Sequence, residues 1–249
     1  MANKFYVPGA QRAAKVQDLF ATVAPRYDLI NDLQSFGWHR YWKRRLLALA
    51  EPIAGARALD VCCGTGDVAF ALSARGANTT GLDFSEGMLA VARQRQNRQN
   101  HPAARAVNFL SGDALALPFA DGSFDLVTIS YGLRNLADFK GGLRELTRVL
   151  APGGRLLVLD FGKPDNALWR WLYFQHLRWV CPVFGKLFCG DAATHGYILD
   201  SLKAYPAQHG VDAALRELGH TDTRMIHLFG GMMSLNLGRR PPAPRMPAT

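Results

Sequence analysis

The chain has 249 residues, of which 49% are hydrophobic and 20% charged, a composition typical of a folded globular protein with a sizeable core. It holds no apolar run of 18 residues, and its start, MANKFYVPGAQR, does not read as a signal peptide, so we expect a cytoplasmic protein in a reducing compartment. The formal net charge of +9 fits nucleic acid, an anionic membrane surface or a merely basic solvated surface, and charge alone does not choose among them.

Residues 1–50 contain short helical patterns such as VQDLFATVA, and we expect them to form a helical cap over a substrate site. Strand-like and helix-like runs then alternate. In chain order the sequence predicts strand 57–62, helix 67–75, strand 79–84, helix 85–97, strands 106–111 and 124–130, helix 138–150 and strand 155–161. This alternation predicts an α/β fold, with a mostly parallel sheet and helices on both faces.

Residues 163–205 break the alternation, and we interpret them as an aromatic lid. The segment ALWRWLYFQHLRWVCPVFGKLF mixes seven aromatic side chains with basic ones, the mixture expected where acyl chains meet anionic headgroups. The proposed apolar anchors and their basic neighbours are Trp169, Phe174, Trp179, Arg170, Arg178 and Lys186. A helix buried in an ordinary core would look similar, so both interpretations stay open.

After this insert the core pattern returns. VDAALRELG predicts a helix, and two strands are expected near 222–229 and 232–238. The proline-rich end, residues 241–249, is expected to be disordered. The predicted core therefore comprises residues 51–162 and 206–240.

The stretch LDVCCGTGDVAF, residues 59–70, predicts a strand, a tight turn and a helix, which is where α/β sheets bind cofactors. Its loop Gly64-Thr65-Gly66 fits the dinucleotide fingerprint G-x-G-x-x-G/A. Asp83 ends the next strand 19 positions beyond Gly64, where a ribose-binding acid belongs. A nicotinamide nucleotide is one candidate ligand, and an ordinary turn without a ligand is the simpler alternative.

Two carboxylates help to separate the candidate cofactors. Asp60 at the strand end and Asp67 at the helix start would repel a pyrophosphate, which needs the positive end of a helix. S-adenosylmethionine carries a sulfonium and an ammonium group, for which carboxylates are favourable partners. The loop therefore favours this cofactor, with Asp60 among the residues that bind it.

Further candidates lie at the ends of the next two strands. Asp113, with Ala114 behind it, is placed to accept a hydrogen bond from an adenine amino group, and Ser130 ends the fourth strand over the same crevice. Taken alone, Asp113 is equally a turn residue before Leu115. In series with the glycine loop and Asp83 it is interpreted as a ligand.

The four cysteines are Cys62, Cys63, Cys181 and Cys189. They lack the paired C-x-x-C spacing of a structural zinc site, and adjacent cysteines are poor joint ligands. We expect them to pack as small hydrophobic residues, and we expect no metal.

Longer stretches carry a family resemblance that runs from about residue 12 to 238. LFATVAPRYDLINDLQSFGWHRYWKR, GLDFSEGML, GDALALPFADGSFDLVTISYGLRNLAD, RVLAPGGRLLVLDF and YILDSLKAYP resemble the menaquinone and ubiquinone biosynthesis C-methyltransferases, the demethylmenaquinone methyltransferase group. Many class I methyltransferases share the glycine loop and the PGG turn. The stretches YDLINDLQSFGWHRYWK and YGLRNLAD are specific to this group.

The resemblance implies a Rossmann-like class I methyltransferase fold with seven strands, the last one antiparallel. It implies methyl transfer from S-adenosylmethionine to a ring carbon of a polyprenylated quinol, either demethylmenaquinol or a benzoquinol of ubiquinone biosynthesis. The residues that resemble the family's cofactor contacts are Thr65, Asp83, Asp113, Ala114 and Ser130. The chain departs from many relatives at Cys62 and Cys63, where Gly or Thr is common, and at His195, where an aromatic is frequent.

Methylating a ring carbon requires ionisation of a quinol hydroxyl, whose pKa is about 10. We assign Arg134 to stabilising the oxyanion and Asn135 to orienting an oxygen, with a salt bridge from Arg134 to Asp138 as the alternative. The candidates for a base are Tyr27, Asp32, His39, Asp160 and His195. Tyr27 and Asp32 join the predicted catalytic residues, although Asp32 could instead cap a short helix.

A nucleic-acid methyltransferase is the main rival, because the net charge favours it. Enzymes that methylate exocyclic amines usually carry an Asn/Asp-Pro-Pro-Tyr/Phe loop after the fourth strand, and here that place reads SYGLRN. A binding module without catalysis is disfavoured by the acids Asp83 and Asp113. Neither the quinol ring nor the oligomeric state follows from the sequence.

Overall fold

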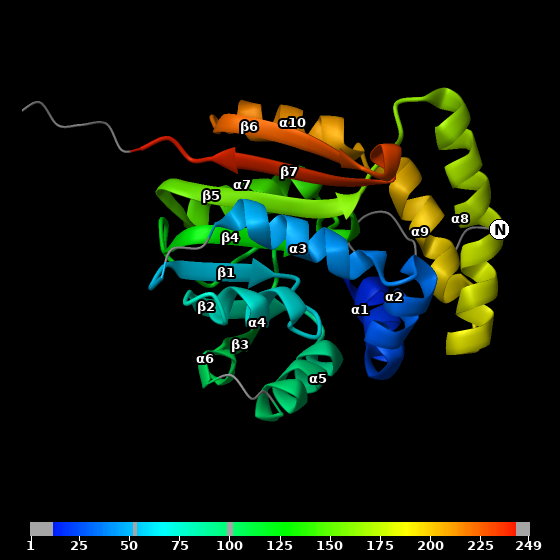
Figure 1. Ribbon diagram of the computed structural model, residues 1–249, viewed down its shortest axis with the longest axis horizontal. Helices are drawn as coiled ribbons and strands as arrows, with labels where there is room; N and C mark the ends of the chain where they lie inside the picture. Colours follow the sequence, from blue (N-terminus) through cyan, green and yellow to red (C-terminus); the bar gives the residue numbers. More distant parts are fainter. Residues whose placement is uncertain (1–11, 52–53, 99–101, 243–249) are drawn as a thin grey trace, which may run out of the picture.

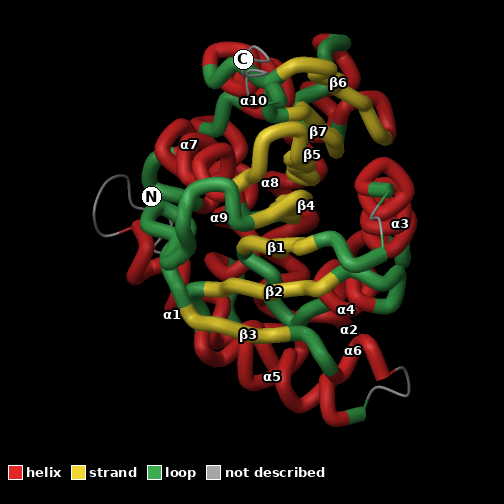
Figure 2. The backbone as a smooth tube through the Cα atoms, turned by 90° about the vertical axis from the view of Figure 1, so that its left-hand side faces the viewer, coloured by secondary structure: helices red, strands yellow, loops and turns green. Residues whose placement is uncertain are grey.

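The computed structural model describes residues 12–51, 54–98 and 102–242. Within these residues, seven strands form one sheet in the order β3-β2-β1-β4-β5-β7-β6 (Figures 1 and 2). The strands are β1 (Arg57–Val61), β2 (Asn78–Asp83), β3 (Asn108–Ser111), β4 (Phe124–Ser130), β5 (Leu150–Phe161), β6 (Thr221–Leu228) and β7 (Met233–Arg239). β7 is antiparallel to β5 and β6, whereas the other neighbouring strands pair in parallel. The mostly parallel sheet with an antiparallel last strand is therefore confirmed.

Helices cover both faces of this sheet. They are α3 (Trp38–Ala50), α4 (Asp67–Ser73), α5 (Glu86–Asn97), α6 (Pro102–Arg105), α7 (Phe139–Val149) and α10 (Ala207–Glu217). Ala58 packs in one hydrophobic core with Leu46 of α3, while its neighbour Leu59 packs in another with Leu146 of α7. Successive strand residues point to opposite faces, which explains why these neighbours enter different cores.

The remaining helices gather at the end of the sheet where the parallel strands finish (Figure 1). They are α1 (Arg12–Val23), α2 (Tyr27–Ser35), α8 (Ala167–Cys189) and α9 (Ala193–Ala204), with the short 3-10 turns η1 (Ala24–Arg26), η2 (Leu133–Asn135) and η3 (Phe229–Gly231). Parts of the predicted cap and of the predicted lid are thus neighbours in space. The last helix of the N-terminal region, α3, lies instead along the sheet.

Several predicted boundaries move by a few residues, and β5 moves most. It begins at Leu150 rather than 155, because Leu150 already pairs with Phe124 before an irregularity in the ladder. The aromatic part of the lid forms the single helix α8 of 23 residues with Pro182 inside it, and α9 follows within the lid. The predicted disorder of 241–249 falls mainly on residues 243–249, which lie outside the described ones, as do residues 1–11 of the cap.

Candidate active site

Two adjoining cavities lie at the carboxyl ends of the parallel strands. The strand-end cavity is lined by residues that include Gly64, Asp83, Asp113, Ala114 and Ser130. The helical cavity, with a volume of about 340 Å³, is lined mostly by apolar side chains of α1, α2, α3, α8 and α9. Phe20, Tyr27 and Tyr131 line both cavities, which therefore meet at these three side chains.

Asp83, at the end of β2, organises the glycine loop. Its Oδ2 accepts a hydrogen bond from the Gly64 backbone N–H at 2.8 Å, and its Oδ1 accepts one from the Ser85 N–H at 2.9 Å. Burial raises the pKa of Asp83, and the backbone donors oppose this rise. Since each carboxylate oxygen can accept a second hydrogen bond, Asp83 can also bind a pair of ribose hydroxyls in this cavity.

The strand-end cavity contains buried polar atoms that suit a polar ligand. The Ser130 Oγ, the Tyr131 hydroxyl and the Asn135 Oδ1 have no hydrogen-bond partner among the described residues, and all three residues line the cavity. A buried polar atom without a partner costs about 1–3 kcal/mol. Asp113 also lines the cavity, while its Oδ1 accepts from the Leu115 N–H at 2.9 Å and so forms a turn as well. This donor and acceptor set fits the adenosine and amino-acid groups of S-adenosylmethionine.

Three predicted cofactor residues, Asp60, Thr65 and Gly66, line neither cavity. The buried Asp60 carboxylate accepts a hydrogen bond from the Thr128 hydroxyl at 2.7 Å, and burial raises its pKa to about 7. The Thr65 hydroxyl donates to Asp28 at 2.8 Å. Gly66, at a φ of 89°, precedes α4. The structure therefore gives these residues contacts that shape the loop, and we expect no direct contact with the cofactor.

Asp67 is not the uncompensated carboxylate that the sequence predicted. Asp67 forms ion pairs with Lys43 at 2.7 Å and with Arg95 at 2.6 Å. Although burial acts to raise its pKa, the two cations hold the pKa of Asp67 well below its usual range. Its charge is thus compensated, and Asp67 does not favour a cationic ligand over an anionic one.

Arg134 lies in the wall of the helical cavity and is only 4% exposed. Its Nη1 lies 3.2 Å from the Oδ1 of Asp160, and its backbone N–H donates to Oδ2 at 3.0 Å. Its Nη2 donates to the Tyr197 hydroxyl at 3.1 Å. The alternative pairing with Asp138 is wrong, because Asp138 pairs with Arg144 at 3.2 Å.

Tyr131 lies where the two cavities meet. Its φ of 60° is uncommon for a residue other than glycine, and its carbonyl accepts hydrogen bonds from Arg134 Nη1 at 2.5 Å and Asn135 Nδ2 at 3.2 Å. Asn135 lines the strand-end cavity and Arg134 the helical one. Two neighbouring side chains of η2 thus serve adjoining cavities. Neither Tyr131 nor Tyr197 was predicted as a site residue, although Tyr131 lies in the SYGLRN stretch that follows the fourth strand.

The predicted bases differ in what surrounds them. Tyr27 lines both cavities, but burial raises the pKa of its hydroxyl well above 10, so it stays protonated at neutral pH. Asp32 lines neither cavity and bonds to His39 and Arg40. His39 is buried and lines the helical cavity. Asp160 is engaged by Arg134.

Helix α8 is half buried and half exposed along its length. Tyr173 and Leu177 pack toward the helical cavity, whereas Leu168, Trp179 and Leu187 are 66–71% exposed. Phe174, one of the predicted anchors, packs against the core. The outward apolar face, called here the α8 stripe, consists of Leu168, Trp171, Leu172, Trp179, Val183 and Leu187. Among the described residues, no helix combines the length and the hydrophobicity that a membrane span requires.

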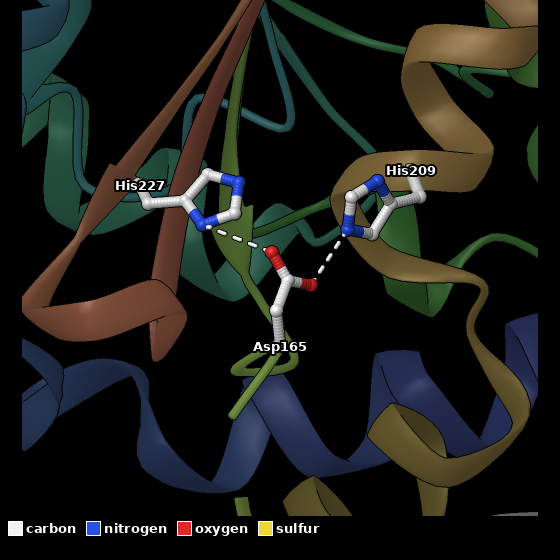
Figure 3. A group of neighbouring side chains, drawn as sticks. All are labelled: Asp165, His209 and His227. Atoms are coloured by element: carbon white, nitrogen blue, oxygen red, sulfur yellow. Dashed lines mark hydrogen bonds and ion pairs between the residues drawn. The ribbon is translucent and has the colours of Figure 1, made fainter. Parts of the chain in front are cut away.

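A group of titratable side chains lies outside both cavities. Asp165, His209 and His227 come from the β5–α8 connection, α10 and β6, and they point toward one another in Figure 3. The Asp165 Oδ1 is 2.7 Å from the His209 Nε2, and its Oδ2 is 3.7 Å from the His227 Nδ1. No cysteine belongs to this group among the described residues. Cys63 and Cys181 are buried free thiols, and Cys62 is a half-buried one.

Comparisons with known proteins agree on the family. The model described as the ubiE/COQ5 methyltransferase family matches residues 9–240. A demethylmenaquinone methyltransferase of Thermus thermophilus is 42% identical over 225 residues, which cover 90% of this chain and all of that protein. A ubiquinone/menaquinone biosynthesis C-methyltransferase of Cereibacter sphaeroides is 37% identical over 234 residues, covering 93% of each chain.

The fold also matches solved structures. The crystal structure of a SAM-dependent methyltransferase from Aquifex aeolicus aligns with a TM-score of 0.57 and 17% identity, covering 79% of this chain and 88% of that one. At this identity the likeness shows the fold, which is the fold expected from the sequence.

Proposed function

This chain belongs to the ubiE/COQ5 methyltransferase family and is an S-adenosylmethionine-dependent methyltransferase, and we propose that its acceptor is a ring carbon of a polyprenylated quinol. Demethylmenaquinol is the first candidate, because the Thermus relative is named for it. A benzoquinol of ubiquinone biosynthesis is the alternative, since the Cereibacter relative carries both names.

One observation carries the proposal, namely that two cavities with different polar groups meet. The strand-end cavity offers the carboxylates of Asp83 and Asp113 and buried polar atoms without a partner among the described residues, whereas the helical cavity has the cationic Arg134 in its wall. An aromatic ring in the helical cavity would reach the junction at Tyr27 and Tyr131. Apolar pockets of a few hundred Å³ with a few convergent polar groups are typical of small-molecule sites.

The residues of the strand-end cavity would bind and orient the cofactor. We propose that Asp83 accepts from the ribose hydroxyls, that Asp113 and Ala114 bind the adenine edge, and that Ser130 and Asn135 contact the amino-acid part. The bound cofactor supplies an electrophilic methyl group. Phe20 and Tyr131, which line both cavities, would help to orient the quinol ring toward the cofactor, and such orientation supplies much of the acceleration in enzymes of this kind.

Arg134 would stabilise the quinol oxyanion in the helical cavity. Its side chain also pairs with Asp160, so its charge is partly compensated, but its Nε has no partner among the described residues. A fixed guanidinium in a site with little water stabilises a developing negative charge more strongly than water does. Asn135 faces the other cavity, so we propose that it orients the cofactor rather than the quinol oxygen.

The α8 stripe supports a peripheral contact with a membrane, where a polyprenylated substrate would reside. Its exposed apolar residues lie beside the basic residues Arg178 and Lys186, and Arg178 also stacks over the Trp179 ring at 5.4 Å. The inward face of the same helix lines the helical cavity. We therefore propose that α8 rests on an anionic membrane surface and lets the isoprenoid chain pass into the cavity.

The direct test offers the purified protein labelled S-adenosylmethionine and each reduced acceptor, and identifies products by mass spectrometry. We expect a demethylated naphthoquinol with a short isoprenoid chain to gain one methyl group on carbon. A benzoquinol accepted in preference would support the alternative. Binding of the cofactor without methylation of either ring, but with methylation of RNA or DNA, would contradict the quinol proposal.

A further inference from the structure

A His–Asp pair from α2 and α3 lies beside the helical cavity. The His39 Nε2 lies 2.7 Å from the Asp32 Oδ1; His39 is buried and is among the residues that line the cavity, whereas Asp32 is half-buried and does not line it. The α2–α3 turn brings these residues together, because Phe36 and Gly37 adopt left-handed backbone with φ of 49° and 75°. The sequence therefore folds back within seven positions.

Asp32 is held as an oriented carboxylate. Arg40 donates to both of its oxygens, through Nε to Oδ1 at 2.7 Å and through Nη2 to Oδ2. These hydrogen bonds, followed by that from His39, lower the pKa of Asp32 to about 2. An ionised carboxylate accepts only, so the shared hydrogen resides on Nε2 and the Nδ1 of His39 carries the free lone pair.

The free Nδ1 is the group of interest. It is buried and has no hydrogen-bond partner among the described residues. Burial lowers the pKa of His39, and the hydrogen bond to Asp32 partly offsets this effect. Of the charges nearby, Lys43 lowers the pKa of His39 and Asp67 raises it. Arg40 is a further nearby charge, and it pairs with Asp32. The imidazole is therefore neutral at neutral pH and able to take a proton.

We propose that His39 is the general base of the methyl transfer and that Asp32 is its positioning residue. This inference rests on the proposed quinol substrate. Two other predicted candidates are less suited, since Tyr27 stays protonated and Asp160 is engaged by Arg134.

The proton and electron balance is complete. The quinol O–H bond breaks and its proton moves to Nδ1, which forms an imidazolium beside the Asp32 carboxylate. The ring carbon uses the electron pair thus released to bond to the methyl carbon, and the carbon–sulfur bond breaks with its pair going to sulfur. The ring carbon then loses its hydrogen as a proton, the oxygen regains one from the imidazolium, and one proton is released overall.

The test is the pH profile of single-turnover methylation with saturating cofactor and quinol. We expect His39→Gln to lower the rate at pH 7 by about 10²–10⁴-fold, the usual worth of general base catalysis. Its rate should climb toward that of the wild type as pH approaches the quinol pKa of about 10, because the substrate then ionises by itself. Cofactor affinity should stay unchanged.

The Asp32→Asn variant tests whether Asp32 positions His39 for proton transfer or only stabilises the fold. It should lower the rate less than His39→Gln and move the acid limb of the profile to lower pH, because Asp32 raises the pKa of His39. His176 also lines the cavity, so His176→Gln is the competing variant. If His176→Gln abolishes the acid limb while His39→Gln keeps the wild-type rate and profile, the assignment to His39 is overturned and the quinol proposal survives. A wild-type protein that methylates no quinol would overturn both.

A second, independent observation concerns Asp165, His209 and His227. Their ligand atoms all lie within 4.8 Å of one another, and the three side chains come from separate elements (Figure 3). Two imidazoles and one carboxylate are a common ligand set for zinc, which keeps a fourth position open. In such sites the Zn–N and Zn–O distances are about 2.0–2.2 Å. Nickel, cobalt and copper ions also accept such donors.

We infer that this group binds a divalent transition-metal ion and so ties the start of α8 to α10 and β6. Asp165 immediately precedes Asn166, whose side chain caps α8 by accepting from the Trp169 N–H at 2.9 Å. A metal held here would therefore fix the base of the helix that lines the helical cavity. The site lies apart from the residues proposed for catalysis.

Calorimetric titration of the metal-free protein with zinc chloride tests this inference. We expect one equivalent to bind, and we expect His209→Gln and His227→Gln each to weaken binding at least about tenfold. Asp222→Asn, which changes another exposed carboxylate near the C-terminal strands, should bind as the wild type does. Equal binding by the wild type and the double histidine variant, or no binding by the wild type, would overturn the site.

Discussion

Arg134 and Asn135 are neighbours in the chain yet line different cavities, so their roles can be separated by substitution. Position in the sequence explains why both were expected at the site, since η2 directly follows the end of β4. Their partners were not predictable. Asp160 belongs to β5, 26 residues away, and only the completed sheet brings its carboxylate to Arg134.

Asp83→Asn should weaken cofactor binding. The substitution replaces a carboxylate that holds the loop N–H groups of Gly64 and Ser85 by an amide with one acceptor oxygen, so a ribose hydroxyl loses its partner. We expect calorimetry to show at least about tenfold lower affinity for S-adenosylmethionine, equivalent to about 1.4 kcal/mol. The exposed Asp121→Asn serves as the control. Wild-type affinity in a folded Asp83→Asn protein would rule out the assigned role.

Arg134→Lys should fold and bind the cofactor but methylate slowly. Lysine keeps the charge near Asp160, yet it lacks the planar fork that reaches Asp160 and Tyr197 together. We expect the turnover number to fall at least about tenfold, because the partner charge develops in the transition state. Arg134→Ala leaves Asp160 buried without its cation and should destabilise the fold by about 3–5 kcal/mol. A full turnover number in Arg134→Lys would make Arg134 a purely structural residue.

At the scale of helices and strands, regular periodicity explains what was predictable. The strands at the sheet centre are continuous apolar runs, and their carboxyl ends meet at one edge, so Gly64, Asp83, Asp113 and Ser130 were foreseeable as neighbours. The His39–Asp32 pair was not, because it depends on the left-handed turn at Phe36 and Gly37. The aromatic composition of α8 also did not predict which of its faces packs against the core and which is exposed.

The two faces of α8 lead to a prediction about membranes. Liposome co-sedimentation at low salt should be strong with anionic lipid and weak with neutral lipid. Arg178→Gln and Lys186→Gln should each reduce binding to anionic vesicles roughly fivefold, as about 1 kcal/mol per basic residue implies. Lys140→Gln on α7 also removes an exposed positive charge and should have no such effect. Equal sedimentation with both lipids, or none with either, would remove the membrane contact from the proposal.

The folded molecule buries Asp60 and Asp160 and half-buries Asp83 at or beside its active site, and removal from water raises the pKa of all three. Each raised pKa means that the folded state holds a proton that the unfolded state releases more readily. Between the two pKa values, stability therefore falls as pH rises. Carboxyl groups such as Asp67 and Asp125 act in the opposite sense, because ion pairs lower their pKa and their stabilisation is lost as pH falls.

Asp60 gives the clearest test, since its pKa moves from an ordinary 3.8 to about 7. Asp60→Asn keeps an oxygen to accept from the Thr128 hydroxyl but never ionises, so it lacks the penalty that the wild type incurs as pH rises. The free energy of unfolding of Asp60→Asn relative to the wild type should grow by about 1.4 kcal/mol per pH unit from pH 5 to 7 and then level off. Denaturant unfolding at several pH values measures this difference, in which contributions from all other groups cancel. Cofactor affinity should be unchanged, because Asp60 lines neither cavity. A tenfold loss of affinity would restore Asp60 as a cofactor ligand. A difference in unfolding free energy that does not depend on pH would show that the Asp60 carboxyl ionises normally in the folded protein.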